Sequence, residues 1–518
     1  MYTFSSKLRT FSIVLMVLGA LGIGYGFLTA PKDIQEVEKI LAADSHGHGE
    51  GHAEKQHEIK DDAKLDDPRK EITRGESNAK SSTINLTGDA AESHPADSVA
   101  PSAAVAEGTS DTMAIAPVAA APAHAANAAQ HAAPEHSEAD AHAEHEKHLE
   151  HVLHQLQNKP WAAFYTACIF FMLVSLGVLS FYAIQQVSQA GWSPVLFRVM
   201  QGITAYLPVG SVIFFVFLLL CGFHVNHLFS WLAEGITDPA SPNYDSIIAG
   251  KSGYLNFGFW IIRAAVFLLG WNLYRFLSRK YCLAQETSDD NSNYTRNFKI
   301  SAGFLVFFIV SESIMSWDWI MSLEPHWFST LFGWYVFASF FVSGITLICM
   351  VTLYMKSRGY LDFVNTSHIH DLAKYMFGMS IFWTDLWFAQ FMLIWYADIP
   401  EEVTYFVTRI ELYNLPFFGA LVLNFVFPIL ILMHTDFKRI TWIMVMTGSV
   451  LLFGHYINFF NMVMPGTVGA NWFIGVPEIG SLLFFLGLFL MVVFTAMTKA
   501  PLLAKRNPYI EESKHFHY

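Results

Sequence analysis

Ten long apolar segments, separated by short polar connections and one long polar insert, dominate this sequence. The first covers about 9–29, and the others lie near 161–186, 197–223, 254–277, 299–322, 330–355, 373–397, 414–434, 440–463 and 479–498. Each approaches or exceeds the roughly 20 residues that an α-helix needs to cross the hydrocarbon layer of a membrane. The pattern predicts an all-α membrane protein with ten transmembrane helices.

The first apolar segment follows Lys7 and Arg9, which gives it two interpretations. It resembles a cleaved signal peptide, but the residues from Gly24 to Ala30 form only a weak small-residue cleavage site. The run is also long enough to span a membrane. We therefore favour a retained first helix within residues 1–30.

Residues 31–159 form an insert rich in Ala, His, Glu, Asp, Ser and Pro, with almost no aromatic residues. Such a chain buries too little apolar surface to order itself, so we predict a largely disordered segment with a helix near 140–157. Five histidines recur there at every third position, namely His142, His145, His148, His151 and His154. Part of this row would share one helix face, as a metal site requires, but a solvated, pH-sensitive tether is the simpler interpretation. We predict no metal site.

The charge of the chain belongs to this insert. The whole sequence is 53% hydrophobic and 14% charged, with a formal net charge of -13. Residues 31–159 contain 24 acidic and 11 basic side chains, and the remaining chain contains 20 of each. The acidity is therefore no property of the membrane region, and the absence of a basic patch argues against a nucleic-acid partner.

Basic residues in the connections predict the orientation of the helices. Those after the fourth, sixth and eighth segments, together with the C-terminal tail, carry Arg275, Arg279, Lys280, Arg296, Lys299, Lys356, Arg358, Lys374, Lys438, Arg439, Lys499, Lys505 and Arg506. The alternate connections outside the insert hold chiefly Lys251 and Arg409. The positive-inside rule then predicts cytoplasmic N and C termini, with the insert across the membrane.

Arg263 and Glu312 lie deep within apolar segments, where an ionisable residue is costly and usually marks a pathway or a functional site. At about 1.5 Å per residue, they lie ~14 Å and ~15 Å from the outer edge of the hydrocarbon, so they are candidates for an ion pair. The alternative is a structural ion pair that only fixes two helices. Ser311 and Ser313 flank Glu312 and offer hydroxyl groups for a proton relay.

Asp385 and His455 form a second candidate group, ~18 Å and ~12 Å from the outer edge by the same measure. A carboxyl group near an imidazole can pass a proton. A lone His in an apolar helix is equally well explained as a hydrogen-bonded core residue. His434 and Asp436 follow the eighth segment, where a solvated helix end or the entrance of a proton pathway would explain them.

The connection after the fifth segment interleaves Asp318, Glu324 and His326 with aromatic residues. Such a surface suits a docking partner or the head group of a quinone, and His224 and His227 end the third segment on the same side. Haem b needs opposed His pairs on facing helices, which this chain does not offer. The four cysteines show no Cys-x-x-Cys-His run and no cluster for iron–sulfur, so partner subunits would have to carry electrons.

Two longer runs resemble a known family. Residues 316–335, SWDWIMSLEPHWFSTLFGWY, and 388–405, FAQFMLIWYADIPEEVTY, are similar to the integral membrane subunits of the polysulfide reductase type. The similarity is greatest to those of alternative complex III, a bacterial quinol:cytochrome c oxidoreductase. The resemblance implies two four-helix bundles, within 160–322 and 323–465, flanked by the first helix and by a last helix and tail in 466–518.

The resemblance also implies a function and partners. Such a complex lies in the bacterial inner membrane and contains a multihaem cytochrome c, an iron–sulfur subunit and two related membrane subunits, one binding quinol and one thought to conduct protons. The His-rich insert makes this chain look like the second. The expected proton pathway contains Arg263, Glu312, Asp385, His434, Asp436 and His455, and the candidate quinol or docking residues are His224, Asp318 and His326.

Two alternatives stay open. The first is the quinol-oxidising subunit itself, with menaquinol or another quinol near His224, Asp318 and His326. The second is a secondary transporter, for which helices broken near mid-membrane are expected, and Pro208 and Pro428 are candidates for such breaks.

Overall fold

The computed structural model describes the backbone of residues 2–47 and 138–517. The chain divides into two compact units, Met1–Lys39 with His145–Tyr518, and Ile40–Glu144. The prediction of a disordered insert falls mainly on residues outside the described part. The side chain of His142 also lies outside it. All the following packing belongs to the first unit.

The described residues are helical and contain no strand. The long helices are α1 (Ser6–Thr29), α4 (Glu138–Val187), α6 (Tyr206–Gly222), α8 (Phe257–Gln285), α9 (Ser292–Trp319), α10 (Phe332–Ser357), α11 (Thr366–Ala397), α15 (Thr441–Val468) and α16 (Val476–Met497). Shorter α-helices are α2 (Ile34–Gly47), α5 (Phe197–Ile203), α7 (Ser246–Gly250), α12 (Pro400–Glu411), α13 (Asn414–Leu421), α14 (Phe427–Leu432) and α17 (Ile510–Lys514). Single turns are η1 (Pro194–Leu196), η2 (Ser230–Leu232), η3 (Met321–Leu323), η4 (Val422–Val426) and η5 (Phe437–Arg439), of which η4 is a π-helix.

Ten helical segments of the described chain are long and apolar enough to cross a membrane, which confirms the predicted all-α membrane class. The second of them is longer than expected. The helix predicted near 140–157 and the span that begins near 161 are one continuous helix, α4, which passes through Pro160 without a break. Helix α2, at the start of the insert, was not expected from its composition.

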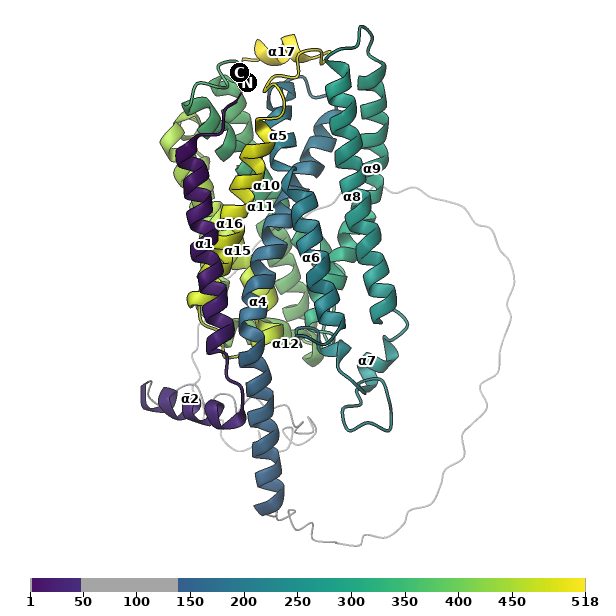
Figure 1. Ribbon diagram of the computed structural model, residues 1–518, viewed down its shortest axis with the longest axis vertical. Coiled ribbons are helices and arrows are strands. Elements are labelled where there is room, and N and C mark those ends of the chain that lie inside the picture. The colour runs from purple at the N-terminus through teal and green to yellow at the C-terminus, as the bar shows by residue number, and fades with distance from the viewer. Residues whose placement is uncertain (1, 48–137, 518) are drawn as a thin grey trace, which may run out of the picture. The chain divides into compact units, whose positions relative to one another are not determined.

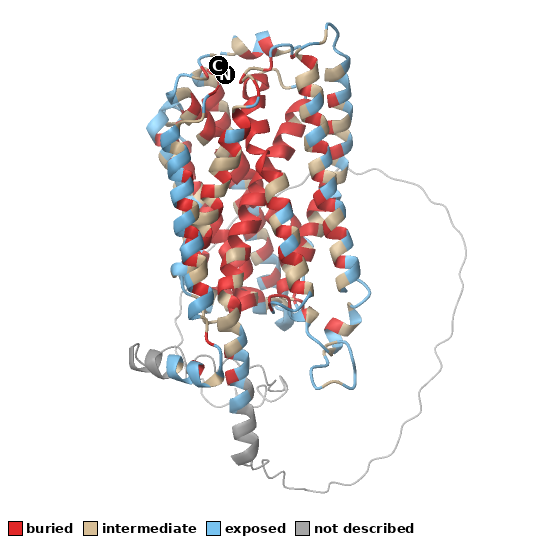
Figure 2. Ribbon diagram, viewed as in Figure 1, coloured by how far each residue is buried: buried red, intermediate tan, exposed pale blue. Residues whose placement is uncertain are grey.

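Helices α4 and α10 form the centre of the membrane region. Their most apolar windows are 94% and 83% buried, against 28% for α1, and Figure 2 shows both as mostly buried ribbons. They meet at two glycines, because a Cβ on Gly177 would lie 2.5 Å from the Phe340 carbonyl and one on Gly344 would lie 2.9 Å from the Val178 nitrogen. Small residues allow membrane helices to approach this closely.

The other helices pack around this centre. Helix α8 packs against α9 and α6, whereas α11 and α15 pack against α10, and α13 packs against α15. The first and last spans, α1 and α16, lie side by side along their length (Figure 1). The predicted division into two four-helix bundles remains a prediction.

Both chain ends lie at one end of the helices (Figure 1). The Thr3 hydroxyl is 2.9 Å from the Tyr360 hydroxyl, and the Asn365 amide donates to the Phe516 carbonyl. The loops that contain α7 and η3 lie at the opposite end. The predicted cytoplasmic location of both termini remains a prediction.

Candidate functional site

A buried ion pair joins α8 to the end of α9. Arg263 donates to both carboxylate oxygens of Asp318, from Nε at 2.7 Å and from NH2 at 2.9 Å. The third guanidinium nitrogen donates to the Tyr254 carbonyl, and the Tyr254 and Phe259 rings lie 4.0 and 4.2 Å from the guanidinium carbon. Asp318 is fully buried, and its carbonyl also accepts from Trp260. The pair therefore has nearly all of its hydrogen bonds satisfied.

The expected pairing of Arg263 with Glu312 is wrong. The two positions do lie at similar depth, but long side chains on a helix point toward its N-terminal end. The Arg263 guanidinium therefore reaches back toward Tyr254 and meets Asp318, which lies ~9 Å beyond Glu312 along α9.

Glu312 is consequently a buried carboxyl group without a basic partner among the described residues. One oxygen accepts from the Ser313 hydroxyl at 3.3 Å, and the other oxygen has no hydrogen-bond partner in the described part of the chain. The neighbouring Ser311 hydroxyl accepts from the Trp271 indole at 2.9 Å. Of the two serines that the sequence offered as relay groups, only Ser313 contacts the carboxyl group.

A second arginine cluster joins α12 to the loop after α9, and sequence analysis did not identify it. Arg409 is 1% exposed and donates to Glu324 at 2.6 Å and to the carbonyls of Asn461 and Tyr405. Its guanidinium carbon lies 3.3 Å from the centre of the Tyr405 ring, which stacks on Trp327. Desolvation alone would lower the pKa of Arg409, but Glu324 raises it above the ordinary value.

The sequence held a signal for this second pair. Arg409 was interpreted only as an orientation marker and Glu324 only as part of a docking surface. A basic and an acidic residue that both lie among aromatic residues at the same membrane face are candidates for a desolvated pair.

His455 is fully buried in α15, and neither ring nitrogen has a hydrogen-bond partner among the described residues. Its ring packs edge-on against Trp383 of α11, with centroids 5.3 Å apart. Next to it, the Ser339 hydroxyl accepts from Trp383 and from Asn458, and Asn458 also accepts from the Tyr335 hydroxyl. His455 therefore lies beside a saturated polar cluster without joining it.

Asp385 does not face His455, contrary to the expectation that the two are neighbours. Trp383 and Asp385 are two residues apart on one helix, which places their side chains about 200° apart around the axis. Trp383 contacts His455, so Asp385 points to the outside, where it is exposed. Its predicted place in a proton pathway remains a prediction.

Glu478, on α16, is a further buried carboxyl group that sequence analysis missed. One oxygen accepts from the Gly475 backbone N–H at 2.9 Å and caps the helix, and the other has no partner among the described residues. Its position at the start of an apolar segment gave it the appearance of an ordinary helix cap.

The remaining candidates lie in loops at the two ends of the helices. His224 is exposed, and His326 is bound to the Asp245 carboxylate at 2.6 Å. The backbone N–H of Ile248, followed by His326, lowers the pKa of Asp245. His434 and Asp436 are both exposed beyond α14. The structure shows no contact that unites His224, Asp318 and His326.

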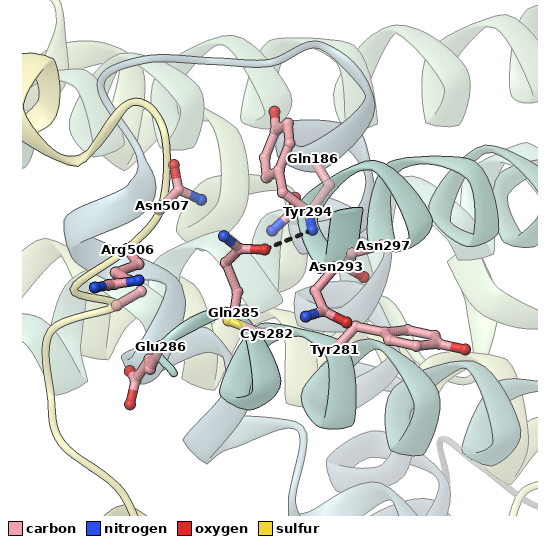
Figure 3. A pocket seen from close by; sticks show the side chains of 11 residues that line it. Gln186, Tyr281, Cys282, Gln285, Glu286, Asn293, Tyr294, Asn297, Arg506 and Asn507 are labelled. Carbon is pink, nitrogen blue, oxygen red and sulfur yellow. Dashed lines mark hydrogen bonds between the residues drawn. The ribbon is translucent and has the colours of Figure 1, made fainter. Parts of the chain in front are cut away.

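A polar network fills the end of the molecule that carries the termini. The Tyr182 hydroxyl lies within hydrogen-bond distance of four side chains, Gln186, Gln201, Ser278 and Asn297. Arg198 links Gln201 to Glu286 at 2.7 and 2.5 Å. Gln186, Glu286 and Asn297 also line a pocket between α8, α9 and the C-terminal tail, in which Gln285 accepts from the Tyr294 backbone (Figure 3).

No group of three or more His, Cys, Asp or Glu side chains in the described residues has the arrangement of a metal site. Within the row of histidines, His154 packs edge-on against His227, with ring centroids 5.2 Å apart. Burial, followed by His154 and His224, lowers the pKa of His227.

Comparison with known proteins found no matching family model and no matching curated protein. The site itself contains two arginine–carboxylate pairs at one membrane face and isolated acid and base groups, Glu312 and His455, within the helices. An isolated acid or base at such a depth can take up and release a proton, whereas a saturated ion pair holds helices in place.

Proposed function

We propose that this chain is a membrane subunit of a bacterial respiratory complex of the alternative complex III type, which oxidises quinol and reduces a cytochrome c. Its task is to conduct protons, while iron–sulfur and haem c subunits carry the electrons. The resemblance of residues 316–335 and 388–405 to that family supports the proposal. The four cysteines are buried and unpaired, and they offer no ligand cluster for an electron carrier of its own.

The observation that carries the proton-conducting role is the state of Glu312 and His455. Both are buried inside membrane-spanning helices and both have polar atoms without a partner among the described residues. An ionisable residue in a membrane span is expensive to keep, so its retention indicates a function. Glu312 lies on α9, which packs against α8, and His455 lies on α15, next to Trp383 of α11.

The buried network around Tyr182 is the candidate supply route from the end with the termini. It includes seven polar side chains that bond to one another, and its Asn297 lies on α9, the helix that also carries Glu312. The Ser301 hydroxyl continues the series, 2.8 Å from the Tyr274 hydroxyl. Phe304 and Phe308 lie between this group and Glu312, so the route needs water at that step.

The test uses the whole complex reconstituted into vesicles. The Glu312→Gln and His455→Gln variants are expected to slow proton transfer at least about tenfold, because each removes a group that binds the proton. Electron transfer from quinol to cytochrome c in the presence of an uncoupler should be retained. Glu411→Gln is the matched control, since Glu411 is exposed at the end of α12. An unchanged ratio of protons to electrons in both buried variants would contradict the proposal.

The contacts of the candidate quinol residues favour proton conduction over quinol oxidation. Both carboxylate oxygens of Asp318 are used by Arg263, and the His326 ring is bound to Asp245. The Asp318 carboxylate is therefore engaged by Arg263, whereas His326 uses only Nε2 for its contact with Asp245.

Secondary transport is the second candidate, and two helix irregularities support it. The third span is interrupted at residues 204–205, shortly before Pro208, and a π-helical turn precedes Pro428 in the eighth. Purification in mild detergent separates the two functions. Haem absorbance that co-purifies with the chain supports the respiratory complex, whereas a colourless chain that purifies alone supports transport.

A further inference from the structure

Asp385 lies on the outer surface of α11, within the part that crosses the membrane. The helix runs from Thr366 to Ala397, so at about 1.5 Å per residue Asp385 lies ~18 Å from one end and ~28 Å from the other. It is exposed, and no described residue forms a hydrogen bond or ion pair with it. A carboxylate in this position would face the hydrocarbon, where ionisable side chains are rarely tolerated.

The residues around Asp385 form a continuous exposed strip. Its members are spaced three and four residues apart and are all exposed: Gly378, Ile381, Asp385, Phe388, Met392 and Trp395. Alternating steps of three and four residues are the pattern by which one helix packs along another. A Cβ on Gly378 would meet nothing within 4 Å, so a second helix has room to approach closely there.

We propose that this strip, the α11 strip, is the docking surface for a transmembrane helix of another polypeptide that carries Lys or Arg opposite Asp385. The charges on the rest of the chain support a basic partner. Two carboxylates of the described chain are neutralised in this way, Asp318 by Arg263 and Glu324 by Arg409, so a basic side chain is a fitting partner for a desolvated carboxylate. Asp385 has no such partner in the described chain, and a neighbouring subunit can supply it.

A second copy of this chain is a poor occupant. A two-fold axis along the membrane normal sets equivalent positions of a packed helix opposite each other. Asp385 would then face the Asp385 of the other copy across the contact, and two carboxylates would repel. The proposal requires only that the chain spans a membrane, so it does not depend on the redox function proposed above.

Photo-crosslinking in native membranes tests the proposal on the full chain. A photoreactive amino acid is placed at Phe388, or at Val306 on α9 as a control that is also exposed and apolar. The Phe388 position should crosslink to a transmembrane segment of a different polypeptide, and mass spectrometry should find Lys or Arg in that segment at the depth of Asp385. The Val306 position should not give this adduct.

The contribution of the Asp385 charge is tested in the same photo-crosslinking assay. Asp385→Asn should lower the yield of the adduct at least fivefold, whereas Asp385→Glu should retain it. Exchange of the two charges, with Asp385→Lys in this chain and Asp in place of the basic residue of the partner, should restore it. Adducts with lipid alone, with a second copy of this chain, or with a helix that lacks a basic residue would each overturn the proposal.

Discussion

Arg263 leaves α8 toward the N-terminal end of that helix, and its guanidinium reaches the Tyr254 carbonyl and the Asp318 carboxylate. This direction, rather than the depth of the Cα atoms, decides which acid it neutralises. Glu312 is left without a basic partner among the described residues, and it becomes the better candidate for proton transfer.

Breaking the Arg263–Asp318 pair should destabilise the protein strongly. Asp318→Leu leaves Arg263 buried without its partner, and removal of one member of a buried pair costs about 3–5 kcal/mol. The double variant Arg263→Met with Asp318→Leu should recover much of that loss, because no unpaired charge remains. Thermal unfolding in detergent measures both.

The exposed pair of Arg506 and Asp289 is the control for this measurement. Its side chains are 49% and 98% exposed, and exposed pairs contribute about 0–1 kcal/mol. Asp289→Leu should therefore change the unfolding temperature little. Equal effects of Asp289→Leu and Asp318→Leu would contradict the buried-pair interpretation.

The contact between α4 and the loop after α6 should respond to pH. Burial, with His154 and His224, lowers the pKa of His227 below its ordinary value of 6.5. The folded state therefore favours the neutral ring, and the resulting stability is complete above pH 6.5 and is lost as the pH falls toward the lowered pKa. Acidification from pH 7.5 to 5.5 should loosen the contact of Asn158 with the His227 backbone.

Hydrogen exchange of the segment around His227, corrected for the intrinsic effect of pH, measures this opening. The His227→Gln variant should lose the additional exchange at pH 5.5. His515→Gln, at the other end of the molecule, should behave like the unchanged protein. Exchange that rises equally in all three would exclude His227 as the cause.

At the scale of elements, helix α1 depends on backbone contact with α16. A Cβ on Gly22 would lie 2.8 Å from the Gly480 Cα, and one on Gly19 would lie 2.3 Å from the Phe484 nitrogen. A Cβ on Gly24, on the same helix, would meet nothing within 4 Å. Substitutions at Gly22 and Gly24 therefore separate the effect of close helix packing from the effect of replacing a glycine within a helix.

Gly22→Leu should push the two helices apart and destabilise the protein by about 1–3 kcal/mol, the usual cost of overpacking. Gly24→Leu should be neutral or slightly stabilising, since glycine disfavours a helix. Disulfide formation between cysteines introduced along α1 and α16 reports their separation. Equal loss of this crosslink in both variants would show that the close approach at Gly22 is unimportant.

At the scale of the whole molecule, both termini lie at one end and the loop before α7 lies at the other (Figure 1). The positive-inside rule assigns the end with the termini to the cytoplasm. The four native cysteines are buried, so a single introduced cysteine can report the side of the membrane.

The expected outcome is labelling of Lys505→Cys from the cytoplasmic side and of Glu234→Cys from the opposite side by a membrane-impermeant thiol reagent. Both positions are exposed, which makes the two reactions comparable. The unchanged protein is the control and should not react. The reverse pattern would invert the predicted orientation, and labelling of both positions from one side would contradict the placement of the C-terminal tail and the loop before α7 at opposite ends.

The class of this protein can be predicted from local composition, because a membrane imposes a minimum apolar length on each helix that crosses it. The sequence identified ten spans and located Arg263, Glu312, Asp385 and His455. Their partners became clear only from the packed helices, since pairing depends on the direction in which side chains leave helices that are distant in sequence. The tertiary structure joined Arg263 to Asp318 and Arg409 to Glu324, turned Asp385 outward, and left Glu312 and His455 buried with unsatisfied polar atoms.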